Sequence, residues 1–146
     1  MKRMLVLGGL VVAVAGMSAV YVSAAPTYVG ASKCKMCHKV EYQSWEKTKH
    51  AQATEVAKAS TEWKFETACL QCHATDASED FPGVQCEACH GPGSEYKSIS
   101  VMKDLAKAKA AGLILPTQET CNKCHNGESH HKKVDIKTAF VHEHKK

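Results

Sequence analysis

Eight cysteines and four of the nine histidines in this 146-residue chain share one repeated pattern. A cysteine, two further residues, a second cysteine and a histidine follow one another, as CKMCH at 34–38, CLQCH at 69–73, CEACH at 86–90 and CNKCH at 121–125. These motifs use every cysteine, so no thiol is left for a separate disulfide or a lone catalytic nucleophile. Cysteines at this spacing serve three chemistries: a zinc site, a redox dithiol or a covalently attached haem.

Covalent haem explains all five positions of the pattern. Zinc does not need a histidine directly after the second cysteine in every motif, and a redox dithiol occurs once, near a βαβ pattern that is not visible here. In c-type attachment the two thiols add to the porphyrin vinyl groups, and the next histidine becomes the proximal iron ligand. We therefore predict four haems attached at Cys34, Cys37, Cys69, Cys72, Cys86, Cys89, Cys121 and Cys124, with iron ligands His38, His73, His90 and His125.

The N-terminal segment has the pattern of an export signal. Lys2 and Arg3 precede an apolar run over residues 4–17, and Val22-Ser23-Ala24 provides small residues for a signal peptidase. We predict cleavage after Ala24, which divides the chain into a signal peptide, 1–24, and a haem domain, 25–146. The alternative is an uncleaved membrane anchor, because the apolar stretch is marginally long enough to span a bilayer. Both interpretations place the domain outside the cytoplasm, where bacteria attach c-type haem. We expect the periplasm, with membrane anchoring or an extracellular location as variants.

The composition excludes an ordinary apolar core and gives no support for nucleic-acid binding. After the signal only five tryptophan and phenylalanine residues remain besides scattered Leu, Ile and Val, namely Trp45, Trp63, Phe65, Phe81 and Phe140. The porphyrins must therefore form the core, and the apo-chain should be largely unfolded. The formal charge of +4 falls to +2 without Lys2 and Arg3, and the haem propionates lower it further.

The pattern of helix formers predicts a mainly α fold with much irregular loop, a compact multihaem cytochrome c domain. Helices are expected over 39–59, over 100–111 with Ser100 as N-cap and Gly112 as a stop, and over 134–143. Residues 74–85 and 91–99 are rich in Asp, Ser, Gly and Pro and are expected to form loops. No segment alternates as a strand would.

Five histidines remain as candidates for the sixth ligand of each iron: His50, His130, His131, His142 and His144. His50 lies twelve residues after His38 across a predicted helix, about 18 Å away at roughly 1.5 Å per residue, so it must cap a different haem. His130 and His131 also suit a neighbouring haem, and at most one of them should ligate. The same choice exists between His142 and His144, where helical periodicity favours His144. Met102 is interpreted as a core or surface residue.

The chain resembles the tetrahaem cytochromes of ammonia-oxidising bacteria that accept electrons from hydroxylamine oxidoreductase. The resemblance rests on CKMCHKVEYQSWEKTKHAQA, GVQCEACHGPGSEY and VHEHKK. It implies stacked haem pairs, mostly bis-histidine ligation, and distal ligands at His50 and His142, in preference to His144. The family's second haem lacks a protein sixth ligand, which here implies an open iron above His73.

The sequence also departs from this family. A distal histidine of the family falls where this chain has Ser100, so Met102, His130 or His131 would substitute, or that iron would be open or capped by another protein. The chain is also shorter, especially between the last motif and VHEHKK.

We expect an exported tetrahaem cytochrome that relays electrons between a protein donor and a protein acceptor. Nucleic acid is not an expected partner, membrane proximity would follow from an uncleaved signal, and oligomers are compatible with the pattern. No separate acid, base or nucleophile is evident, so we favour a carrier over an enzyme. The alternatives are a haem enzyme that reduces nitric oxide, hydroxylamine or peroxide at one open iron, and a subunit of a conducting haem filament.

Overall fold

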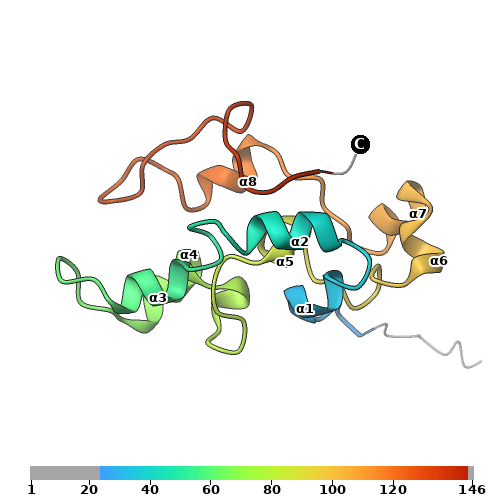
Figure 1. The fold of residues 1–146 in the computed structure, drawn as a ribbon, viewed down its shortest axis with the longest axis horizontal. Helices are drawn as coiled ribbons and strands as arrows, with labels where there is room; N and C mark the ends of the chain where they lie inside the picture. Colours follow the sequence, from blue (N-terminus) through green and yellow to red (C-terminus); the bar gives the residue numbers. More distant parts are fainter. Residues whose placement is uncertain (1–23, 145–146) are drawn as a thin grey trace, which may run out of the picture.

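The structure is a computed structural model that describes residues 24–144. The predicted signal peptide lies almost wholly outside the described residues. Short helices joined by long loops form the described chain (Figure 1), and its only β pairing is isolated bridges from Ala74 to Pro82 and Gly83. The helices are α1 Ala31–Cys34, α2 Lys39–Trp45, α3 Ala53–Lys58, η1 Thr67–Cys69, α4 Leu70–His73, η2 Thr75–Ala77, α5 Cys86–His90, α6 Ile99–Met102, α7 Leu105–Ala110 and α8 Gln118–Asn122. The predicted mainly α, loop-rich fold is confirmed.

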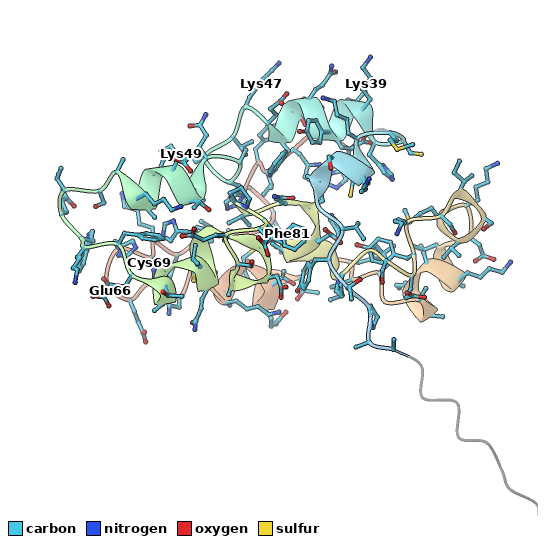
Figure 2. The ribbon with its side chains drawn as sticks, turned by 90° about the horizontal axis from the view of Figure 1, so that it is seen from below. Lys39, Lys47, Lys49, Glu66, Cys69 and Phe81 are labelled. Atoms are coloured by element: carbon cyan, nitrogen blue, oxygen red, sulfur yellow. The ribbon has the colours of Figure 1, made fainter. Side chains whose placement is uncertain are left out.

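The elements spread along one long axis. Helices α3 and α4 lie towards one end, α6 and α7 towards the other, and the segment after α8 runs back along the side of α2 (Figure 1). Lys39 and Lys47 point outward from the two ends of the α2 region (Figure 2), as solvated lysines do. No helix within 24–144 is long and apolar enough to cross a membrane.

The predicted helix over 39–59 is wrong in its middle, because the chain leaves helical geometry after Trp45. The Thr48 hydroxyl donates to the Trp45 carbonyl (2.7 Å), and such local bonds compete with the helical ladder. The Trp45 indole donates to the Val84 carbonyl (2.8 Å), and the Val84 amide donates to the His50 carbonyl (2.8 Å). These tertiary bonds hold residues 46–52 against the segment before α5.

The predicted helix over 100–111 is also two helices. Asp104 caps α7, since its carboxylate accepts from the amides of Ala106 (3.0 Å) and Lys107 (3.1 Å). Ser98, and not Ser100, precedes α6, whereas the stop at Gly112 is confirmed by its φ of +102°.

The helix expected over 134–143 is absent. The Gln118 side chain donates to the Val134 carbonyl (2.9 Å), which a helix beginning there would use, and it accepts from the Ile136 amide (3.0 Å).

The described residues bury very little apolar side chain. The buried hydrophobic residues are Ala31, Trp45, Leu70, Ala74, Tyr96 and Ala108, and three of these six are alanines. Large apolar groups lie at the surface instead, such as Met36 at 83% exposed and Phe140 at 68%. The protein atoms alone therefore do not form a closed core, as expected if the porphyrins complete it.

Buried polar groups link the helices that surround this open interior. The Thr54 hydroxyl at the start of α3 donates to the His73 carbonyl and accepts from the Gly83 amide (2.7 Å). The Thr75 hydroxyl donates to the Gly83 carbonyl (3.1 Å) and accepts from the Gln85 amide (2.8 Å). Both threonines are almost completely buried, so these bonds fix α3 and α4 against the loop that leads into α5.

Candidate haem centres

Each CxxCH motif occupies one turn of helix. Helix α5 contains the whole third motif, and α4 contains the second motif from its second residue onward. Helix α1 ends at the first cysteine of the first motif, and α8 ends one residue after the first cysteine of the fourth motif. The His38 amide bonds the Cys34 carbonyl (2.9 Å) and the His125 amide bonds the Cys121 carbonyl (2.8 Å), which completes a helical turn. Positions i, i+3 and i+4 are neighbours on one helix face, so the two sulfurs and the imidazole of a motif are presented together. All eight cysteines are free thiols.

Thiols from different motifs interact in three pairs: Cys34 with Cys86, Cys89 with Cys121, and Cys72 with Cys124. Hydrogen bonding to Cys86, with burial, raises the pKa of Cys34, and burial with the nearby Cys72 raises the pKa of Cys124 to about 12. Burial, with the nearby Cys121, also raises the pKa of Cys89. The motifs are therefore neighbours in the order 34, 86, 121, 69, which differs from their order in the sequence.

Three of the four motif histidines are oriented by the backbone. The Nδ1 of His73 lies 3.1 Å from the Ala53 carbonyl, that of His90 3.0 Å from the Ile114 carbonyl, and that of His125 2.9 Å from the Lys132 carbonyl. A carbonyl oxygen only accepts, so each Nδ1 carries the proton and each Nε2 keeps its lone pair for a metal. This is the outer-shell arrangement that metal-bound histidines usually have.

The same three histidines each face a second histidine from a distant segment. The ring centroids are 6.0 Å apart for His50 and His125, 6.2 Å for His90 and His142, and 6.0 Å for His73 and His130. With a metal–nitrogen bond of about 2 Å on each side, two imidazoles that share one metal ion have their centres roughly 6 Å apart. All three pairs have the spacing of a bis-histidine iron.

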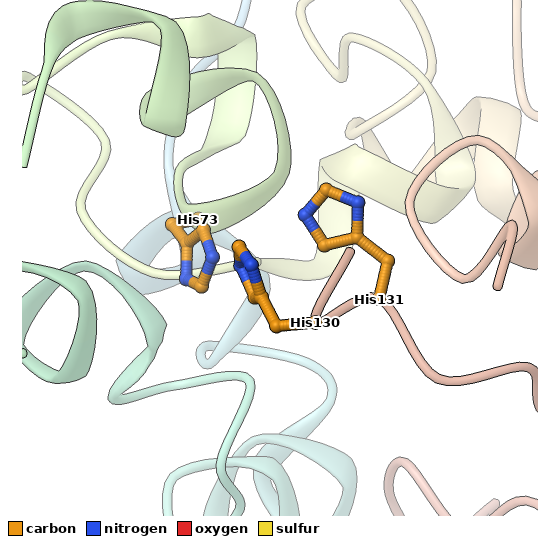
Figure 3. A group of neighbouring side chains, drawn as sticks. All are labelled: His73, His130 and His131. Carbon is orange, nitrogen blue, oxygen red and sulfur yellow. The ribbon is translucent and has the colours of Figure 1, made fainter. Parts of the chain in front are cut away.

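Two of these pairs contain a third histidine. The ligand atoms of His73, His130 and His131 lie within 4.8 Å of one another, and Figure 3 shows the His130 ring beside that of His73. His131 lies 4.3 Å from His130 between ring centroids. At the other site His144 lies 4.2 Å from His142. In both places one histidine has the ring spacing of a ligand opposite the motif histidine, and the ligand atom of the other lies within 4.8 Å of the same site.

The local environment keeps two of these rings neutral. Burial, with the nearby His125, lowers the pKa of His50. Burial lowers the pKa of His90, the bond to Ile114 opposes this shift, and the nearby His142, His144 and His38 lower the pKa further. Only the neutral imidazole has a lone pair to give to a metal, so both shifts favour ligation.

Hollows lie beside two motif histidines, and the one at His73 has the apolar lining that a flat cofactor needs, whereas the one at His125 is lined mainly by polar side chains. A groove of about 480 Å³ is lined by Val56, Trp63, Phe65, Cys69, His73 and His130, and a second of about 430 Å³ adjoins His125. Cofactor sites typically measure 300–1,000 Å³ and are mostly apolar. With free thiol pairs, oriented imidazoles and an open interior, the residues present fit covalent haem.

Contacts outside the motifs position the second histidines. The Glu143 amide donates to the Ser44 hydroxyl (2.7 Å), which holds the segment of His142 on α2. The Trp63 ring packs on His130 with centroids 5.1 Å apart. Neither contact had a signal in the sequence.

Glu87 has a structural role that the sequence pattern did not indicate. It lies inside the third motif, is 1% exposed, and accepts from the amides of Val29 (3.0 and 3.1 Å), Gly30 (2.7 Å) and Gly93 (2.6 Å). It thereby joins α5 to the segment that leads into α1. An acid between two cysteines is not distinctive in a sequence, because its partners are backbone groups.

His38 differs from the other motif histidines. It precedes α2 and is exposed, and neither a hydrogen bond to its ring nor a ring contact with another histidine is found within residues 24–144. Ser100 is exposed on α6 with its hydroxyl 3.2 Å from that of Ser98, and Met102 is half-buried at the end of α6. The structure thus brings three of the predicted ligand sets together and leaves the fourth incomplete.

The fold and these centres define a tetrahaem c-type cytochrome. Residues 33–91 match the family model described as cytochrome c554 and c-prime. Cytochrome c-554 of Nitrosomonas europaea is 29% identical in an alignment of 137 positions, gaps included, that covers 67% of this chain and 57% of that protein. The structure of reduced cytochrome c554 from the same organism aligns with a TM-score of 0.52 and 26% identity, over 70% of this chain and 66% of that one.

These matches make the chain similar to cytochrome c-554 in sequence and in fold, as the sequence motifs predicted. The chain therefore carries four covalently bound c-type haems. It spans about 57% of the length of the curated relative that it matches.

Proposed function

We propose that the chain is an exported electron carrier that relays electrons between redox proteins through its four haems. The observation that carries the proposal is the set of three opposed histidine pairs, at 6.0, 6.2 and 6.0 Å. A haem iron held between two histidines takes up and releases one electron at low potential. An iron with both axial positions filled by protein exchanges electrons without binding a substrate, which favours a carrier over an enzyme.

In this proposal each motif supplies two thioether links and one axial histidine. The second histidine that would hold each haem is His50 at the site of His125, His142 at that of His90, and His130 at that of His73. His131 and His144 are the spare members of their pairs. The backbone bonds to Ala53, Ile114 and Lys132 orient the motif histidines so that only Nε2 faces the iron.

The close approach of motif thiols supports an order for the relay. Cys34 and Cys86 interact, as do Cys89 and Cys121, and Cys72 and Cys124. The electron path is therefore proposed to follow the motifs in the order 34, 86, 121, 69. The motif at 121 is then internal, and the motif at 34 is terminal.

The export signal at residues 1–24 supports a periplasmic location, with the haem domain beginning at Ala25. Attachment of c-type haem outside the cytoplasm is consistent with this location. The partners are proposed to be redox proteins, one donor and one acceptor.

Flash reduction of the holoprotein by a photogenerated flavin semiquinone tests the relay. All haems of the wild-type protein should be reduced in one kinetic phase, because exchange among neighbours is faster than encounter with the reductant. The variant Cys121→Ala/Cys124→Ala loses the internal haem and should show two phases, since the haem of the motif at 69 is then isolated.

Its matched control is Cys34→Ala/Cys37→Ala, which removes a terminal haem and should keep a single phase. The proposal is wrong if both variants are monophasic, or if the holoprotein consumes hydroxylamine or peroxide at a rate that matches its electron uptake.

A further inference from the structure

We propose that the iron of the first motif, at His38, is the open one in this chain and accepts a small neutral or anionic ligand from solution. This inference rests on the proposed haem assignment, and it reverses the expectation that the iron above His73 is open. It would add a ligand-binding site to a protein whose other irons are closed.

The first step is the pairing of histidines. All nine histidines lie among the described residues, and four of them belong to motifs. His50, His130 and His142 each face a motif histidine at about 6 Å, which leaves His131 and His144 as the remaining donors. Each of these two is in contact with its paired neighbour, His130 or His142, and within ligand range of the iron site that this neighbour serves.

The second step is that the His73 site is filled. His130 is held beside His73 by the Trp63 ring, 5.1 Å away, and His131 lies next to it as a second donor (Figure 3). Two imidazoles therefore occupy the space beside His73 that an open iron site would need. An iron there is closed by the chain itself.

The third step is that His38 belongs to an exposed motif and has no second donor in contact with its ring among residues 24–144. Its motif lies at the surface, with Cys37 and His38 exposed and Met36 83% exposed. Lys35, three residues before His38, places its Nζ over the Tyr42 ring at 4.6 Å, so it is directed at that ring. Within residues 24–144 no histidine ring contacts His38.

The local charge also favours access by small anions. Lys33, Lys35 and Lys39 surround the motif, all exposed. Cationic side chains near a site raise the local concentration of anions and do not hinder neutral molecules. A five-coordinate iron at this surface would therefore bind carbon monoxide when reduced and cyanide when oxidised.

The test is the spin state and ligand stoichiometry of the purified tetrahaem protein. We expect about one quarter of the ferric iron to be high-spin by low-temperature EPR, and roughly one carbon monoxide bound per four reduced haems. A haem content of four with every iron low-spin and inert to both probes overturns this inference and leaves the electron relay standing. A haem content below four overturns the haem assignment itself.

Three variants identify which iron is open by elimination. His50→Ala, His130→Ala/His131→Ala and His142→Ala/His144→Ala each remove the second ligand of one closed iron, so each should raise the high-spin fraction from about one quarter to about one half. If the iron of His73 were the open one, the His130/His131 variant would leave the fraction unchanged, which would refute the proposal. The same holds for the other two sites.

Two further measurements guard against variants that do not fold and against a ligand donated by another molecule. A crystal structure of the wild-type protein with cyanide should show the ligand on the iron bonded to His38, and cyanide on another iron would refute the assignment. A high-spin fraction that appears only on dilution would mean that a second copy of the chain caps this iron, which also overturns an open site.

Discussion

Replacement of Glu87 by glutamine should destabilise the folded holoprotein strongly, although it changes neither the size nor the shape of the side chain. The carboxylate is 1% exposed and accepts four short bonds from three backbone amides. One oxygen bonds Gly93 at 2.6 Å and the other bonds Gly30 at 2.7 Å. Whichever way a glutamine amide turned, one of these two N–H groups would face an NH₂ group.

The size of the effect follows from those contacts. A buried donor without an acceptor costs about 1–3 kcal/mol, and a bond to a charged acceptor contributes about 1.5–3 kcal/mol. We therefore expect Glu87→Gln to lower the free energy of unfolding by about 3 kcal/mol. Glu87→Ala strands both buried amides and should cost more, about 5 kcal/mol, if the two losses add.

Guanidinium unfolding of the holoprotein, followed by far-ultraviolet circular dichroism and Soret absorbance, measures this loss. The covalent haems stay attached to the unfolded chain, so the transition reports folding alone. Glu95→Gln is the matched control: Glu95 is exposed and accepts only from the neighbouring Ser94 hydroxyl, so its change should stay within roughly 0.5 kcal/mol. Equal stability of the two glutamine variants would refute the role assigned to Glu87.

Three further outcomes are expected. Tyr96→Phe removes the bond from the buried phenol to the Gly91 carbonyl (2.6 Å) and should cost about 1 kcal/mol at pH 8. Burial raises the pKa of Tyr96, so its contribution is complete below pH 10 and is lost as the pH rises above it; the difference between wild type and variant in urea unfolding should shrink there. Gly83→Ala should cost at least ~2 kcal/mol by thermal unfolding, because φ is +79° and a Cβ would lie 2.5 Å from the Ala51 carbonyl oxygen. Gly112→Ala is the control for backbone strain alone, since φ there is +102° and a Cβ would meet nothing closer than 4.0 Å. Chain expressed without haem attachment should give the circular dichroism of an unfolded polypeptide, since protein atoms bury only six apolar residues within 24–144.

Helix boundaries were the part of the fold that sequence patterns predicted least well. Propensity predicts one helix over 39–59, yet the bonds of Trp45 and His50 to Val84 interrupt it. Propensity likewise misses the cap at Asp104. In each case the deciding contact is either a tertiary bond or a side-chain cap whose strength is comparable to the helix propensity of the whole segment.

The cofactor, in contrast, is determined by the sequence itself. Covalent attachment needs two thiols and a histidine within five consecutive residues, and one helical turn presents them together whatever the rest of the chain does. The four motifs are therefore a local property, and the family matches agree with the haems they predict. The mainly α fold and the number of spare histidines could be read in the same way.

Only the tertiary structure decides which histidine faces which motif. His50 and His125 are separated by 75 positions in the sequence, and His90 and His142 by 52, so no local pattern relates them. The ring pairs form because a backbone bond at Val84 and side-chain bonds of Ser44 and Gln118 bring distant loops onto the motif helices. The absence of such a loop over His38 is equally a property of the folded chain, because a sequence contains the ligands but only the fold brings them within reach of an iron.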